Sequence, residues 1–262
     1  MSEITLQKVG SENLDRCGIG CIADRKHVGY GPKVEWLRER FEEGLRFFHL
    51  RNEKGKALAF LEYVPGEHAW RPVEARGWLF VHCLWVYPSR QKVGRLGSRL
   101  IQACLDEARA MGSLGVAAMV SDGPWMAAKE VFLKNDFQVV AAADRFELVA
   151  RRLRKGGEEP RFRDISGNAA RYPGLHLIYA AQCPMLPRSV EDLRDEAEKH
   201  GLELNVTALT TAEEAQNAPS YYGVFNLLWD GQLLSDHYVS RARFRNILKK
   251  IVPGDARRRP GN

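Results

Sequence analysis

The chain has 262 residues, and 45% of them are hydrophobic, which is enough apolar side chain for a packed core and argues against a disordered protein. The formal net charge of +6 favours anionic partners, either a nucleic acid or an anionic cofactor. No zinc-finger, RNP-type or helix-turn-helix pattern accompanies this charge, so we do not expect a nucleic-acid-binding protein.

Cysteine and histidine usage bears on disulfides and metals. The five cysteines are an odd number without CxxC spacing, which argues against a disulfide framework and a structural zinc site, and we predict no metal. No apolar run approaches the roughly 20 residues that span a bilayer. The N-terminus lacks the apolar stretch of a secretory signal, and we expect a cytoplasmic protein with no membrane partner.

Hydrophobic periodicity in the first part of the chain predicts mixed α and β structure. We expect strands at 4–9, 47–50, 57–64, 77–87, 115–120, 137–141 and 145–151. We expect helices at 34–45, 97–111 and 124–134. The centre of this region is therefore one strand–loop–helix unit.

A polar stretch rich in glycine, proline and charge then breaks both periods, and it predicts a linker. Beyond it we expect strands at 175–180, 202–209, 224–229 and 232–235, and helices at 184–200, 212–217 and 240–251. This order is βαβαββα. We therefore divide the chain into a domain at 1–153, a linker at 154–173, a domain at 174–252 and a mobile tail at 253–262.

The most informative segment is the loop between the long strand and the helix predicted at 97–111. Gly94 and Gly97 allow backbone amides to approach a phosphate closely, and the following helix N-terminus adds unpaired amides and a positive dipole end. Lys92 and Arg95 add positive charge. This pattern predicts an anion site, although a plain strand–helix turn would look similar.

The same loop resembles motif A of the GNAT acyltransferases, with the segment 91–97 reading QKVGRLG. Two more segments fit this family in order. The run at 81–88, VHCLWVYP, resembles the strand that precedes the loop, and the run at 128–137, AKEVFLKNDF, resembles motif B. The resemblance implies an α/β (α+β, mixed-sheet) GNAT fold for the N-terminal domain, with acetyl-CoA as co-substrate and an amine acceptor on a small molecule or peptide.

The resemblance also implies where acetyl-CoA binds. It would lie in a gap between the strands that end near Val86 and Val120, with its thioester oxygen on a backbone amide. The implied cofactor-binding residues are Trp85, Val86, Lys92, Val93, Gly94, Arg95, Leu96, Gly97 and Ser98.

For the general base the resemblance implies His82 first, because it lies four residues before Val86, where some relatives carry a working histidine. An unperturbed imidazole also titrates near neutral pH, which suits a base. Glu62 and Glu67 are the rival candidates, and a hydrogen-bonded core histidine is the alternative for His82. The tyrosine that serves as general acid in many relatives is replaced by Phe132, and Tyr87 is a weaker candidate.

The loop that precedes the long strand is expected to overhang the acceptor site. Its Trp70 and Arg71 could bind an aromatic or acidic acceptor, although a solvated loop would fit equally well.

The C-terminal domain resembles a thioredoxin-like fold. Cys183 stands between a strand and a helix N-terminus, where the helix dipole would lower the thiol pKa. The resemblance implies a cis bond before Pro219, facing Cys183. Leu186 replaces the second cysteine of a CxxC pair, so dithiol exchange within the motif is excluded.

The two-domain arrangement is similar to the YoaP-like group of bacterial acetyltransferases, in the runs GEHAWRPVEA at 66–75 and EAQNAPSYYGVF at 214–225. We therefore predict an acetyl-CoA-dependent N-acetyltransferase. The alternative is an acyl-CoA sensor or monothiol redox protein that works through Cys183. The sequence leaves a monomer and a homodimer open.

Overall fold

A computed structural model describes residues 3–87 and 95–251. The strands are β1 Ile4–Val9, β2 Arg46–Asn52, β3 Ala57–Pro65, β4 Val73–Glu74, β5 Leu79–Val86, β6 Gly115–Val120, β7 Gln138–Ala143, β8 Phe146–Arg152, β9 Arg161–Phe162, β10 Leu175–Tyr179, β11 Leu204–Ala208, β12 Phe225–Trp229 and β13 Gln232–Ser235. The helices are α1 Leu14–Cys17, α2 Tyr30–Glu42, α3 Leu96–Ala110, α4 Lys129–Leu133, α5 Leu186–Lys199, α6 Ala212–Gln216 and α7 Arg241–Ile251, with short 3₁₀ turns at Gly66–His68 and Ala169–Arg171. None of these helices is long and apolar enough to cross a membrane.

The N-terminal unit, residues 3–153, is built on a seven-stranded sheet in the order β1-β2-β3-β5-β6-β8-β7. Its two central strands, β5 and β6, run parallel, and their crossover contains α3. The other neighbours pair antiparallel. This mixed sheet confirms the predicted α/β class.

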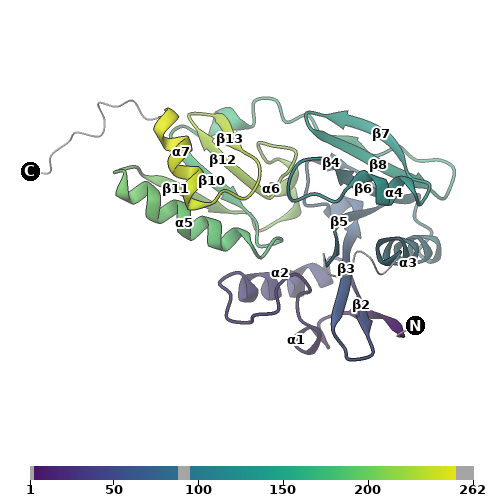
Figure 1. Cartoon of the computed structure of the whole chain (residues 1–262). Helices are drawn as coiled ribbons and strands as arrows, with labels where there is room; N and C mark the ends of the chain where they lie inside the picture. The colour runs from purple at the N-terminus through teal and green to yellow at the C-terminus, as the bar shows by residue number, and fades with distance from the viewer. Residues whose placement is uncertain (1–2, 88–94, 252–262) are drawn as a thin grey trace, which may run out of the picture.

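The two faces of this sheet are covered differently, as Figure 1 shows. On one face lies α3, whose buried apolar stripe consists of Leu100, Ile101, Cys104, Leu105 and Ala108. On the other face lie α2, with buried Trp36 and Leu37, and the C-terminal unit.

The C-terminal unit, residues 174–251, has a four-stranded sheet in the order β11-β10-β12-β13. Only β10 and β11 pair parallel, and the remaining pairs are antiparallel. The element order βαβαββα agrees with the expectation from the sequence. Helices α5 and α7 pack against each other.

The two units share one continuous apolar core. Trp36, Trp70 and Phe80 of the N-terminal unit belong to the same buried cluster as Tyr222 and Phe225 of the C-terminal unit. Residues 154–173 are not a free linker, because they contain β9, which pairs with β4. Much of the face of the sheet opposite α3 is thus covered by the C-terminal unit.

The largest difference from the predicted elements lies after β6. The helix expected at 124–134 is reduced to α4, Lys129–Leu133, because Trp125 has a positive φ of 69° and Ala128 is extended. The sequence pattern also missed α1 and the short strands β4 and β9. Each of these is too short to show a period of its own.

Candidate active site

The central feature of the site is a gap between β5 and β6. Their parallel pairing covers three residue pairs and ends at Val81–Ala118. On its other edge β5 stays paired with β3 as far as Val86, and the register from Val81 to Cys83 leaves His82 as an extra residue. Such a bulge bends a strand and increases its twist. Beyond Val81, β5 stays paired with β3 but no longer with β6, so the two strands part where the gap is expected.

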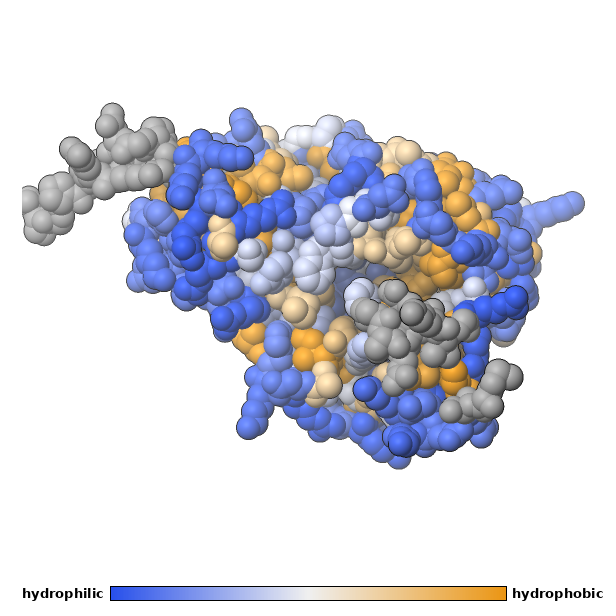
Figure 2. Space-filling model, in the orientation of Figure 1, coloured by the Kyte–Doolittle hydropathy of each residue, from blue (hydrophilic) through white to orange (hydrophobic). Residues whose placement is uncertain are grey.

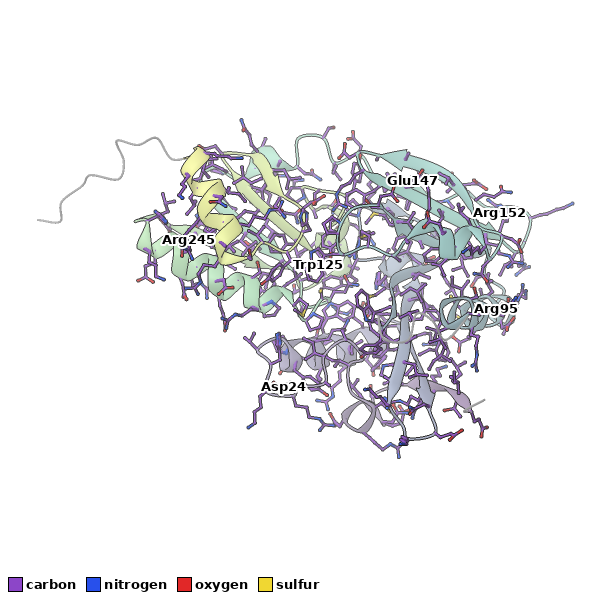
Figure 3. All side chains as sticks on the ribbon, in the orientation of Figure 1. Asp24, Arg95, Trp125, Glu147, Arg152 and Arg245 are labelled. Atoms are coloured by element: carbon purple, nitrogen blue, oxygen red, sulfur yellow. The ribbon has the colours of Figure 1, made fainter. Side chains whose placement is uncertain are left out.

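The N-terminus of α3 opens beside this gap. Arg95, the residue before the helix, is exposed and has a φ of 68°, and its own side chain does not cap the helix. The first amides of α3, with the positive end of the helix dipole behind them, are the groups that would bind an anion. Figure 3 shows Arg95 at α3. Lys92, Val93 and Gly94 lie outside the described residues.

The next residues of α3 have packing roles that the motif does not reveal. Leu96 and Gly97 are buried, and a Cβ built on Gly97 would lie 2.9 Å from Val131 Cγ2. The Ser98 hydroxyl accepts a hydrogen bond from Asn135 Nδ2 at 3.0 Å. Gly97 thus lets α4 approach α3. Leu96 and Gly97 leave only their backbone for a cofactor, whereas the Ser98 hydroxyl can still donate a hydrogen bond.

A buried polar network lies on the face of the sheet that the C-terminal unit covers. The Lys33 ammonium is 2.5 Å from Glu62 Oε2, and both side chains are 2% exposed. Gln182 Nε2 donates to Glu62 Oε1 at 3.2 Å, and Gln182 Oε1 accepts from Arg71 Nη1 at 2.9 Å. Sequence reasoning missed Lys33 and Gln182, because neither stands in a motif.

His82 belongs to the same network. The backbone N–H of Trp70 donates a hydrogen bond to His82 Nε2 at 2.9 Å, so the ring proton is assigned to Nδ1. This Nδ1 atom lies 3.5 Å from Glu62 Oε1. At that distance the Nδ1 contact is electrostatic rather than a good hydrogen bond. Burial lowers the pKa of His82 to about 4. His82 is therefore neutral at pH 7, and its basic nitrogen is already occupied.

Glu62 is charged. Burial by itself would raise its pKa, but the Lys33 ammonium and the contact with His82 outweigh burial and lower the pKa to about 2. The carboxylate is held by Lys33 and Gln182 on its two oxygens. Glu62 thus forms the centre of the network.

Glu67 and Trp70, in the loop that precedes β5, have different surroundings. Glu67 is exposed, and its Oε1 accepts from the Gly77 N–H at 2.9 Å, before β5 begins and at the end opposite the gap. Trp70 is fully buried and packs edge-to-face on Trp36 with ring centroids 5.2 Å apart. The structure therefore does not bring Glu67 to the His82–Glu62 pair.

Neither Phe132, at the usual general-acid position, nor Tyr87, the weaker candidate, is suited to donate a proton. Phe132 is buried in α4 and has no proton to donate. The Tyr87 hydroxyl donates to the Gly20 carbonyl oxygen, and burial raises its pKa. Tyr87 is therefore a poor proton donor to a leaving thiolate.

The thiol of Cys183 does not have the lowered pKa that the sequence predicted. Cys183 lies in the turn before α5, but burial raises the pKa of its thiol, and the hydrogen bond from the Met185 amide does not compensate. The prediction that the helix dipole lowers this pKa is wrong, because the turn is buried against the N-terminal unit. The described residues contain no cis peptide bond, so the predicted cis bond before Pro219 is also wrong.

Two side chains at the end of β5, beside the gap, remain accessible to solvent. Trp85 is 46% exposed, and Val86 is half-buried.

Among the described residues there is no group of three or more His, Cys, Asp or Glu side chains that could hold a metal ion.

The buried imidazoles give a prediction about acid stability. Burial lowers the pKa of His49 to about 3 and that of His82 to about 4. Between pH 6.5 and these values the unfolded chain binds protons that the folded chain does not. The free energy of unfolding should therefore fall as the pH drops below about 6.5, by roughly 1.4 kcal/mol per pH unit for each group.

Urea titrations at pH 7.5 and 5.5 measure this slope. The variant His82→Gln can still accept the Trp70 N–H, so we expect it to fold and to show a smaller loss between the two pH values. An equal loss in the wild type and the variant would contradict a neutral, buried His82.

Most of the N-terminal unit matches a known protein family. Residues 21–134 match the sequence model of the Acetyltransferase (GNAT) family. The chain is 28% identical to the uncharacterized N-acetyltransferase YoaP of Bacillus subtilis (strain 168) over 251 residues, which is 94% of this chain and 98% of that protein. The segment 21–134 is therefore similar to the GNAT acetyltransferases, and the predicted enzyme class, an acyltransferase, is confirmed.

Two solved structures align with more than half of the chain. A GNAT acetyltransferase from Staphylococcus aureus Mu50 aligns with a TM-score of 0.44 at 10% identity, over 58% of this chain and 100% of that one. The PaiA N-acetyltransferase from Thermoplasma acidophilum, determined in complex with coenzyme A, aligns with a TM-score of 0.42 at 11% identity, over 58% of this chain and 99% of that one.

Proposed function

We propose that the protein transfers the acetyl group of acetyl-CoA to an amine of a small molecule or peptide by direct attack. The observation that carries this proposal is the gap that opens between β5 and β6 at the His82 bulge, inside the segment that matches the GNAT family. The helix α3 begins beside this gap with its first backbone amides. A thioester between the strands and a pyrophosphate at the helix would occupy these two features together.

The binding roles follow from this placement. The α3 amides and Arg95, with Lys92, Val93 and Gly94 of the loop, would hold the pyrophosphate. Past Val81 the edge of β5 that faces β6 has no strand partner in the described part of the chain. A backbone amide near Trp85 or Val86 on that edge would polarise the thioester oxygen.

The proton of the attacking amine needs a route that the network does not supply directly. The basic nitrogen of His82 accepts the Trp70 N–H, and Glu62 is paired with Lys33. We assign His82 and Glu62 positioning roles, in which they fix the bulge and hence the gap, and we assign the proton to a water path. Glu67 has no part in this scheme.

For the C-terminal unit we propose a thioredoxin-like fold. Its sheet order, β11-β10-β12-β13 with one parallel pair, and the turn that carries Cys183 before α5 support this assignment. A monothiol redox role is not favoured, because the pKa of Cys183 is raised. The unit instead covers the face of the sheet from which an acceptor would approach the gap.

Charge reversal at α3 tests the cofactor site. Arg95→Glu should weaken acetyl-CoA binding at least about tenfold in calorimetry, since an anion replaces a cation beside the phosphates. Arg109→Glu, at the other end of the same helix, makes the same change in net charge and should leave the affinity within about twofold. Equal effects of the two variants would refute the site.

A further inference from the structure

Two half-exposed tryptophans stand at the ends of the two strands that form the gap. Trp85 lies on β5 beyond the last β5–β6 pair, and Trp125 lies in the loop that follows β6. Each is 46% exposed, although Trp36, Trp70 and Trp78 are buried. An indole that is kept at the surface beside a reaction site is available to a ligand.

Both tryptophans belong to the same side of the sheet. Successive side chains of a strand alternate between its faces. Trp85 shares a face with Cys83, which packs on the core shared with the C-terminal unit, while Leu84 faces α3. The ring of Trp125 lies 5.4 Å from that of Tyr238, in the C-terminal unit. Trp85 and Trp125 therefore flank the gap from the face opposite α3.

The backbone of Trp125 is strained and clamped. Its φ of 69° lies in the left-handed region, which a bulky residue rarely adopts. The loop is tied down by Arg145, which donates to the Ser121 hydroxyl at 3.0 Å and to both oxygens of Asp236 at 3.0 Å. Strain that neighbouring contacts maintain is typical of functional positions.

The views agree with this placement. Figure 3 shows Trp125 where the C-terminal unit meets the N-terminal unit. Figure 2, in the same orientation, shows a hollow near the middle of the visible surface.

We propose that Trp85 and Trp125, with Tyr238 behind Trp125, form the aromatic walls of the acceptor entrance, and that the acceptor is a primary amine bearing a flat aromatic ring. This inference rests on the proposed acetyl transfer. The amine nitrogen forms an amide bond with the acetyl carbon while the carbon–sulfur bond breaks. Coenzyme A leaves as the thiol, and the proton lost by the nitrogen balances the one that the sulfur gains.

The experiment compares 2-phenylethylamine with 2-cyclohexylethylamine, which has a similar size and charge but no π face. The wild type should acetylate the phenyl compound with a kcat/KM about 3- to 10-fold higher, as expected for one or two aromatic contacts. The variants Trp125→Gly and Trp85→Ala should lose this preference through KM, and Leu233→Ala, which removes an exposed side chain on β13, should keep it.

Trp125→Gly also separates binding from folding. Glycine adopts a φ of 69° without strain, so the urea midpoint of this variant should not fall. Acetyl-CoA affinity should be unchanged in Trp125→Gly, and a loss of that affinity would overturn the proposal in favour of an adenine contact.

Two further outcomes count against the aromatic acceptor. No phenyl preference in the wild type would overturn it, and so would acetylation of aliphatic amines alone, although in both cases acetyl transfer would stand. A wild-type protein that fails to bind acetyl-CoA would instead remove the proposed function itself.

Discussion

Replacing Lys33 by methionine should destabilise the protein by about 3–5 kcal/mol, because the Glu62 carboxylate would stay buried without its cation. The Lys33 ammonium also lies 4.1 Å from the centre of the Trp36 ring, so the change removes a second contact. Urea unfolding at pH 7.5 measures the loss. Lys33 is 1% exposed, and water cannot readily replace it.

The stability loss caused by Lys33→Met should depend on pH. In the wild type the pKa of Glu62 is about 2, below its unfolded value of 4.5, so its contribution is present above pH 4.5 and is lost as the pH falls toward 2. Without Lys33, burial should raise this pKa above 4.5. The deficit of Lys33→Met should then be largest at neutral pH and should shrink on acidification.

The double variant Lys33→Met/Glu62→Leu serves as the control. It removes both charges, and we expect it to recover most of the loss. A single variant within about 1 kcal/mol of the wild type would contradict a buried, charge-paired Glu62.

Replacing Gly29 by alanine should force the two units apart at the turn that carries Cys183. A Cβ on Gly29 would lie 1.8 Å from the Pro184 carbonyl oxygen, which is a backbone atom, so no flexible side chain can move aside to make room. Its φ of −91° is ordinary, so the effect is purely steric. We expect a loss of about 1–3 kcal/mol or more in unfolding free energy. Cys21 and Cys183 should also react faster with a thiol reagent.

Gly31→Ala is the matched control in the same helix. A Cβ there meets nothing within 4 Å, so it should stabilise α2 by about 0.5–1 kcal/mol through its helix propensity. Equal stability and thiol reactivity in the two alanine variants would mean that the units do not meet at Gly29.

The sequence predicted the N-terminal fold well where one residue pattern determines one element. The apolar stripe of α3 has the period of a helix and is buried as expected. The gap was expected from the family resemblance rather than from periodicity. Its physical cause, the extra residue at His82, depends on the register between β3 and β5, which no single strand encodes.

The site residues were harder to predict, because their environment comes from distant parts of the chain. Glu62 meets Gln182 across 120 positions of sequence, and only the packed interface shows the contact. The thiol of Cys183 has the local context of a low pKa, but burial between the units raises it. Trp125 interrupts a segment with helical composition, because the loop is held by Arg145 and Asp236.

The release of free coenzyme A tests the central claim most directly. The protein is mixed with excess acetyl-CoA and a panel of primary amines and peptides, and the free thiol is followed with time. We predict amine-dependent release of many equivalents of thiol per protein molecule. Binding of acetyl-CoA with no release above the buffer rate, for every amine tested, would contradict an acetyltransferase and indicate a protein that only senses acyl-CoA.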